Sequence, residues 1–309
     1  MDREQQEILE ELLATGVGID TGLTATSQDN ANHLVEQSGR TAGGTPIRKE
    51  FVQRRDSKNK PLAGPLADMV RRRDLRGLLL YLAILTGASA EPWNVSRPAH
   101  FWARLLDLSP DKGRPAISKA IGRLRDAKLV AIDRRKRQSN ITMLREDATG
   151  EPYTYPTGEK GDRYFKLPFE FWTQGWYQQL DMPGVAMLLV LLNEKNDVVL
   201  PLDRIPGWYG ISRATAQRGF TELENHGLVT TWVNQRPAPL SPIGVTFERH
   251  YKLVGPFAKT DTAKPTTGIN FLTLPDILHP DRTPSPAQRR RHRRANSQTK
   301  RKEEQHDGT

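Results

Sequence analysis

A short segment, 212–221, carries side chains that can form hydrogen bonds with nucleic acid. These side chains belong to Ser212, Arg213, Thr215, Gln217, Arg218 and Thr221. Arginine can donate two hydrogen bonds to O6 and N7 of guanine, and it also binds phosphate. The residue types therefore predict non-covalent recognition of double-stranded DNA. The sequence does not separate side chains that contact bases from those that contact phosphates.

A helix is predicted to present these side chains, because apolar residues recur at helical spacing through the same segment. Ala216, Phe220 and Leu223 stand at positions i, i+4 and i+7, which places them on one face. Ser212 is a typical N-cap residue, and Gly227 is a typical residue directly after a helix. The polar residues then lie on the other faces. The competing interpretation is an ordinary amphipathic helix with a solvated polar face.

The segment 211–229 also resembles the recognition helix of winged-helix regulators. It matches their signature at its Ser-Arg-Ala-Thr start, at the Glu-Leu in its middle and at its Gly-Leu-Val end. The resemblance covers about 20 residues. It implies a helix-turn-helix, in which the first residues of the recognition helix enter the major groove and contact base edges.

An earlier segment, 114–130, repeats the spacing of this helix. The two segments are aligned by laying Lys128-Leu-Val over Gly227-Leu-Val. Arg114 then falls on Arg213, Ile117 on Ala216, Lys119 on Arg218, Ile121 on Phe220 and Leu124 on Leu223. The side chains expected to bind DNA from this first helix are those of Arg114, Ser118, Lys119 and Arg123. The sequence thus indicates two helices of the same DNA-binding type.

Each of the two helices is followed by the pattern of a β-hairpin, which a winged helix requires. After the first helix we expect strands over 129–133 and 141–144. The turn between them carries Arg134, Arg135, Lys136 and Arg137, which we expect to contact phosphates. After the second helix we expect strands over 228–233 and 245–253, joined by a proline-rich loop.

A second similarity follows the hairpins, because Asp-Arg-Tyr-Phe-Lys-Leu at 162–167 matches Glu-Arg-His-Tyr-Lys-Leu at 248–253. Two similarities in the same order indicate an internal duplication. The predicted fold class is mainly α with small β-hairpin wings (α+β), built from two winged-helix domains in tandem. We predict an acidic, mostly disordered segment over 1–45, the domains over 46–167 and 168–257, and an extended, basic, mostly disordered tail over 258–309.

Positive charge is concentrated in one part of the chain. Residues 46–145 carry 23 basic and 9 acidic side chains, a net charge of +14, whereas residues 1–45 stand at −6 and 146–281 at −4. Such a basic block attracts polyanions, of which nucleic acid is the commonest; the alternative is a merely soluble surface. Residues 282–309 stand at +6. Their arginines expected to bind DNA without sequence preference are Arg289, Arg290, Arg291, Arg293 and Arg294.

Further helices and an aromatic segment are expected around these motifs. Pro65 can begin a helix that runs to about residue 86, with arginines 71–73 and 76 in its first half and an apolar second half. A shorter helix is expected over 97–107, and another over 184–193. The aromatic residues of 168–182 either stack on bases or fill the junction between the domains. The lack of interleaved basic residues favours the junction.

The sequence contains no motif of a known catalytic or metal-binding type. It has no cysteine, and its 7 histidines are not spaced as metal ligands. It also lacks a phosphate-binding glycine loop, a nucleophile elbow and a zinc-protease motif. We therefore expect a protein that is not an enzyme and that uses no cofactor and no metal.

The sequence also predicts where the protein resides. The longest apolar run, 78–85, is much shorter than the roughly 20 residues of a membrane helix. The first residues are acidic and amphipathic, unlike a signal peptide. We expect a cytoplasmic, nucleoid-associated protein with no membrane partner.

Three functional hypotheses follow. The chain resembles bacterial DNA-binding proteins with paired winged helices, including plasmid replication initiators, which implies replication initiation or control on a plasmid or mobile element. The second hypothesis is a transcriptional regulator that binds a promoter operator. The third is a protein-docking module with non-specific affinity for nucleic acid. The expected partners are double-stranded DNA, a second copy in a homodimer, or the replication or transcription machinery.

Overall fold

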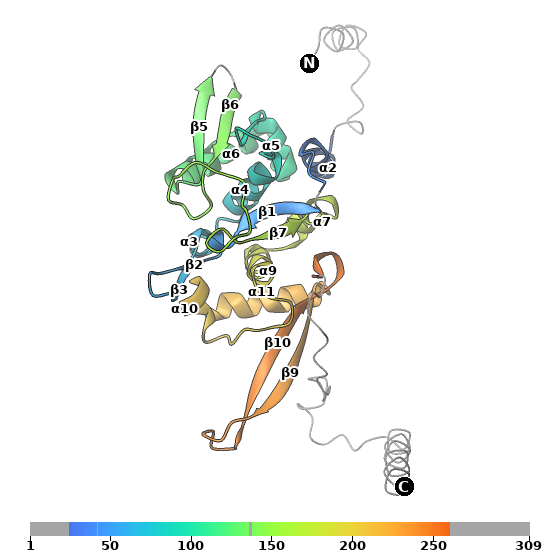
Figure 1. Cartoon of the computed structure of the whole chain (residues 1–309). Helices are drawn as coiled ribbons and strands as arrows, with labels where there is room; N and C mark the ends of the chain where they lie inside the picture. The colour runs from blue at the N-terminus through green and yellow to red at the C-terminus, as the bar shows by residue number, and fades with distance from the viewer. Residues whose placement is uncertain (1–24, 42, 136–137, 260–309) are drawn as a thin grey trace, which may run out of the picture.

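The computed structural model describes residues 25–41, 43–135 and 138–259 (Figure 1). It is a mixed α+β structure in which short helices pack with small antiparallel sheets of two or three strands. The α+β class expected from the sequence is confirmed at this level. No helix among the described residues is long and apolar enough to cross a membrane.

Residues 75–143 form the first of two units that share one order of elements, a helix, a strand, two helices and two strands. The elements of this first unit are α4 (Leu75–Gly87), β4 (Asn94–Ser96), α5 (Ala99–Leu105), α6 (Pro110–Asp126), β5 (Val130–Arg135) and β6 (Gln138–Met143). The strands form a sheet in the order β4-β6-β5. The apolar helix α4 is buried, and the β5–β6 hairpin projects from the helices (Figure 1).

Residues 182–253 form the second unit. Its elements are α9 (Met182–Asn193), β8 (Val198–Val199), α10 (Ile205–Tyr209), α11 (Arg213–Asn225), β9 (Val229–Pro237) and β10 (Val245–Leu253). The strand order β8-β10-β9 is that of the first unit, because the first strand again pairs with the third and the third with the second. The expected return strand 245–253 is confirmed. The two units therefore repeat one topology.

The ends of α6 and α11 show that the two helices are built alike. Lys128 and Gly227, which the sequence alignment pairs, both follow their helix with a left-handed backbone, at φ values of 56° and 67°. In each case the next residue donates its amide to a carbonyl in the last turn, at Leu124 (3.0 Å) and Leu223 (2.9 Å). This is the Schellman type of helix ending. Lys128 takes a conformation that usually favours glycine.

The two units are joined through a third layer of elements. These are β1 (Gly44–Arg48), η2 (Lys49–Phe51), β2 (Gln53–Arg55), β3 (Pro61–Ala63), α3 (Pro65–Arg71), β7 (Tyr164–Pro168), α7 (Glu170–Thr173), α8 (Trp176–Gln179) and η3 (Gly255–Phe257). Strand β1 pairs with β7 in an antiparallel ladder. The buried apolar side chains of both units form one contiguous core with this layer.

A buried ion pair connects β1 to the segment between β6 and β7. The guanidinium of Arg48 is fully buried and contacts the carboxylates of Glu146 at 2.7 Å and Asp162 at 2.5 Å. Burial raises the pKa of Glu146, although the Arg48 guanidinium opposes this change. A buried charge requires such a partner.

The similarity between 162–167 and 248–253 does not mark equivalent strands of the two units. Its interpretation as part of the internal duplication is therefore wrong. Residues 162–167 overlap β7, which pairs with β1 and lies outside the sheet of the first unit, whereas 248–253 belongs to β10. The topological counterpart of β10 is β6. Half-buried strands share an alternation of polar and apolar residues, and that alternation produced the similarity.

The expectation of a mostly disordered segment over residues 1–45 is wrong for residues 27–37, which form a helix. The helix α2 (Ser27–Gln37) begins with a capping box between Thr26 and Asp29. The buried Asn30 side chain donates a hydrogen bond to the carbonyl of Phe101 at 2.9 Å. Contacts with distant residues stabilise this helix, and a composition poor in apolar residues could not reveal them.

The long helix expected over residues 65–86 is divided, because α3 ends at Arg71 and α4 begins at Leu75. Arg73 lies in the left-handed region at φ 53°. The carboxylate of Asp74 then accepts the amide hydrogen of Gly77 at 3.0 Å and caps α4.

Three smaller boundaries also differ from the expectation. α6 begins at Pro110, four residues before the aligned segment 114–130, and its buried Gly113 packs against Ala103. The strand pairing of β5 with β6 continues to Arg135 and Gln138, which shortens the expected turn. Strand β9 likewise continues into the proline-rich loop, to Pro237.

The aromatic residues of 168–182 fill the junction, as favoured from the sequence. Phe171 and Trp172 are fully buried, and Tyr177 is nearly so. The Tyr177 hydroxyl lies 2.8 Å from the Ser27 hydroxyl of α2, and Trp172 contacts the Tyr177 ring at 5.3 Å between centroids. These three rings are not available to stack on bases.

Candidate nucleic-acid interface

The exposed side of α11 carries most of the residues of segment 212–221 that were expected to contact DNA. Its other side is buried, with Ala216, Phe220 and Leu223 at 0–1% exposure. The exposed side chains of the expected set are those of Ser212, Arg213, Gln217, Arg218 and Thr221, whereas Thr215 is half-buried. The apolar periodicity thus predicted the faces of this helix correctly.

Two members of the set contribute to the start of the helix. The Ser212 hydroxyl accepts the amide hydrogen of Thr215 at 3.2 Å, and the two hydroxyls lie 2.9 Å apart. This is the N-cap expected from the sequence. Ser212 therefore caps the helix, and any contact of Ser212 with DNA would use the same hydroxyl.

Arg213 has a carboxylate partner that is itself exposed. Its Nη1 lies 2.8 Å from Oδ1 of Asp203, and the two side chains are 66% and 77% exposed. Exposed pairs of this kind contribute about 0–1 kcal/mol. A phosphate or a guanine can therefore compete for Arg213. Among the described residues, Arg218 forms no salt bridge.

The first unit presents α6 in the matching way. Ile117 and Leu124 are buried, at 0–2% exposure, whereas Ile121, the counterpart of Phe220, is half-buried. The exposed residues include Arg114, Ser118 and Lys119, which align with Arg213, Gln217 and Arg218 of α11. The duplication therefore extends from the topology to the exposed positions of both helices.

Arg123 differs from the other expected residues, because its guanidinium is engaged within the protein. Its Nε and Nη2 atoms donate to the carboxylate of Asp74 at 2.6 and 2.7 Å. Partial burial favours a higher pKa for Asp74, but the hydrogen bonds from Arg123 and Gly77 outweigh this effect, and the pKa is lowered. Arg123 thus connects α6 to the start of α4.

The basic hairpin turn is only partly described. Arg134 and Arg135 belong to β5, whereas Lys136 and Arg137 lie outside the described residues. The five tail arginines, from Arg289 to Arg294, also lie outside them. Their proposed contacts with DNA stay predictions.

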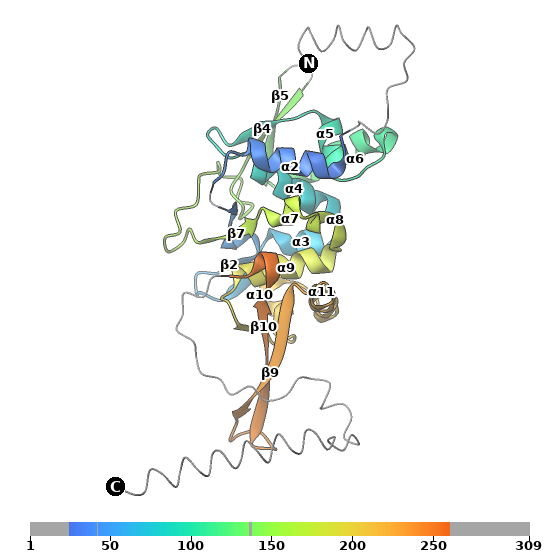
Figure 2. The ribbon, with the colours of Figure 1, turned by 90° about the vertical axis from the view of Figure 1, so that its right-hand side faces the viewer.

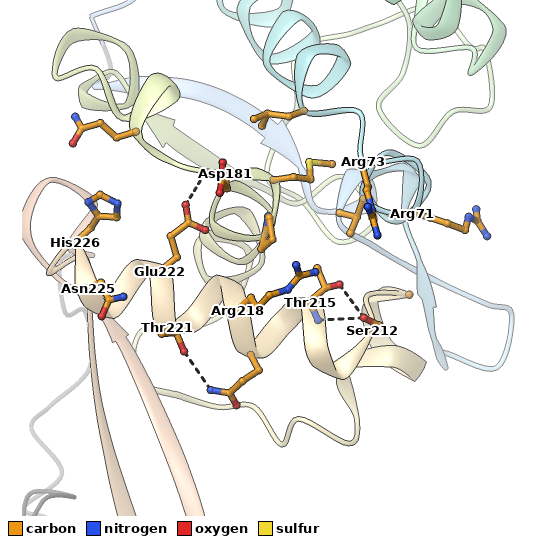
Figure 3. Close-up of a pocket in the computed structure, with 17 residues that line it drawn as sticks. Arg71, Arg73, Asp181, Ser212, Thr215, Arg218, Thr221, Glu222, Asn225 and His226 are labelled. Atoms are coloured by element: carbon orange, nitrogen blue, oxygen red, sulfur yellow. Dashed lines mark hydrogen bonds between the residues drawn. The ribbon is translucent and has the colours of Figure 1, made fainter.

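A groove of about 1110 Å³ separates α11 from the turn between α3 and α4 (Figure 3). Arg73 points into this groove from the turn, and Arg218 lines it from α11. At the other end, Glu222 accepts the amide hydrogen of Asp181 at 2.5 Å. The Glu222 carboxylate therefore lies at the N-terminus of α9, where the helix dipole favours a negative charge.

Two smaller hollows flank α6. One, of about 340 Å³, lies beside the start of α4 and is lined by Arg76, Lys112 and Lys119. The other, of about 270 Å³, lies beside α5 and includes Arg114 and Ser118. Both carry basic side chains. Figure 2 shows α6 and α11 on the same side of the molecule.

Arginines 71–73 and 76 were not among the residues expected to contact DNA. They were expected in the polar first half of one uninterrupted helix, 65–86, whose apolar second half lies in the core. The signal that could have located them is Asp74, a good N-cap residue directly before an apolar run. An N-cap there ends the preceding helix and leaves Arg72 and Arg73 on a turn, with Arg71 and Arg76 at the flanking helix ends.

No group of three or more metal-ligating side chains occurs in the part of the chain that the structure describes. The comparisons with protein-family models, with curated proteins and with solved structures found no match for this chain.

Proposed function

We propose that the two units are winged-helix domains and that the chain binds double-stranded DNA at a specific sequence. The observation that carries this proposal is the repeated topology, in which α6 and α11 present basic and polar residues at the same positions. In a winged helix the third helix is the recognition helix, and the hairpin after it lies beside the DNA backbone.

In this proposal α6 and α11 each enter a major groove. Lys119 and Arg218, at equivalent exposed positions, are suited to donate hydrogen bonds to guanine, as are Arg114 and Arg213. The net charge of +14 over residues 46–145 adds affinity that does not depend on sequence. The basic tail acts in the same way.

We propose replication initiation or control on a plasmid or mobile element as the biological role. Two recognition helices in one chain suit a site made of two half-sites, such as the direct repeats of an origin. A promoter operator is the alternative site, and it would make the protein a transcriptional regulator. We place the protein in the cytoplasm, at the nucleoid, with a second copy or the replication or transcription machinery as further partners.

The test is selection of bound fragments from a genomic DNA library at near-physiological salt, followed by footprinting of the enriched fragments. We expect a bounded footprint. Direct repeats within it support an origin, and a promoter-proximal, two-fold site supports an operator. Binding without enrichment contradicts the proposal and favours the protein-docking alternative.

The matched variants are Arg213→Ala with Arg218→Ala in α11, and Lys58→Ala with Lys60→Ala in the exposed β2–β3 turn as the control. Both pairs remove two positive charges. We expect the α11 pair to weaken binding to the selected site by roughly 1–3 kcal/mol for each lost bidentate contact. The control should weaken it less, by the loss of general electrostatic attraction that both pairs share. Equal effects of the two pairs would show that α11 does not read the site.

A further inference from the structure

The turn between α3 and α4 presents a cluster of positive charge that the proposed recognition helices do not account for. Its members, called the arginine turn below, are Arg71, Arg72, Arg73 and Arg76, and all four are exposed. The left-handed backbone at Arg73 and the cap formed by Asp74 fix the path of the chain here.

The arginine turn lies between α6 and α11. On one side, Arg73 points into the groove that Arg218 lines from α11 (Figure 3). On the other side, Arg76 shares a hollow with Lys119 of α6. The two hydrogen bonds between Arg123 and Asp74 connect the turn to α6. The basic side chains therefore continue from one helix across the turn to the other.

Most of these guanidinium groups are not paired in a salt bridge, although Arg76 is close enough to Asp74 to help lower its pKa. Arg71 forms an ion pair with Asp68 on the same helix, and both side chains are exposed. Arg72, Arg73 and Arg76 form no salt bridge with any other described residue. Three guanidinium groups thus remain available to a ligand, and such groups match the geometry of phosphate oxygens.

We infer that the arginine turn binds the phosphodiester backbone of the DNA segment between the two major-groove contacts. This inference rests on the proposed DNA-binding function. A duplex held by both α6 and α11 crosses the turn, because the turn lies between the helices and the helices share one side of the molecule (Figure 2). Phosphate contacts at this point fix the register of both helices and carry no sequence information.

The first test uses the full chain with Arg73→Gln and Arg76→Gln, and Lys58→Gln with Lys60→Gln as the control of equal charge. Binding to the selected site and to an unrelated duplex is measured over a range of salt concentrations. We expect the turn variant to bind both duplexes more weakly, with an unchanged ratio between them. The slope of log K against log salt should become shallower by about 2, since each lost phosphate contact removes about 0.9.

The second test locates the contact on the DNA. Methylphosphonate linkages, which remove the phosphate charge, are placed between the two protected segments of the footprint. They should weaken binding by the wild-type chain and have little further effect on the turn variant. An effect of equal size in both proteins, or a salt slope like that of the control, overturns the inference. If the α11 variant still loses the site, the DNA-reading function stands and only the role of the turn fails.

Discussion

The guanidinium of Arg123 is joined to the carboxylate of Asp74 by two hydrogen bonds, of 2.6 and 2.7 Å. The same carboxylate accepts the amide hydrogen of Gly77 and caps α4. The Asp74 side chain, within the arginine turn, therefore starts a core helix and connects it to α6. The geometry gives Arg123 a positioning role, although its place on α6 predicted a contact with DNA.

Arg123 and Lys119 should therefore respond differently to the loss of their charge. We expect Arg123→Gln to leave the salt dependence of DNA binding nearly unchanged, because its guanidinium is already paired. Lys119→Gln should make the slope of log K against log salt shallower by about 1, because a cationic side chain in the DNA groove displaces counterions whichever DNA group it contacts. Titrations of the same duplex at several salt concentrations measure both values. A slope change of equal size in both variants would assign Arg123 to the DNA interface.

The Asp74 carboxylate should make the stability of the protein depend on acid pH. Its pKa in the folded state is lowered from the ordinary value of 3.8. Its stabilising effect is thus fully present above that value and is lost as the pH falls through the lower folded-state pKa. For a partly exposed pair the effect is on the order of 1 kcal/mol.

The measurement is urea unfolding of the wild type and of Asp74→Asn, since asparagine keeps the helix cap. The wild type should be the more stable protein at pH 7, and the difference should shrink below pH 3.8. A difference that does not change with pH would mean that the carboxylate charge does not stabilise this turn.

Two helix glycines should respond to alanine in opposite directions. A Cβ at Gly219 would overlap the Pro183 carbonyl and lie 2.6 Å from Cγ of Met187, so α11 and α9 approach each other too closely for a side chain. A Cβ at Gly122 would meet no atom within 4 Å. We expect Gly219→Ala to destabilise the fold by about 1–3 kcal/mol, and Gly122→Ala to stabilise it by up to about 1 kcal/mol.

Urea unfolding of the two alanine variants beside the wild type checks this prediction. Each variant is the control for the other, because both add one methyl group to a helix. Wild-type stability in Gly219→Ala would show that α9 and α11 can separate without cost, and the groove beside the arginine turn would then be variable.

The sequence determined the features that depend on neighbours along the chain. Apolar spacing identified the buried faces of α6 and α11, and the cap residue Ser212 located the start of α11 within one residue. Lys128 and Gly227, which the alignment pairs, follow their helices in the same left-handed conformation. These features follow from helical periodicity and local hydrogen bonds, which the order of residues encodes directly.

Only the tertiary structure decided which distant segments meet. The helix α2 has few apolar residues and depends on partners such as the carbonyl of Phe101. The Asp74 cap marks the break between α3 and α4 locally, but the position of the arginine turn beside Arg218 and Lys119 depends on how these helices pack among the others. Such contacts join residues that are far apart in the sequence, and no local periodicity records them. The duplicated helices could therefore be recognised in the sequence, whereas the position of the arginine turn between them could not.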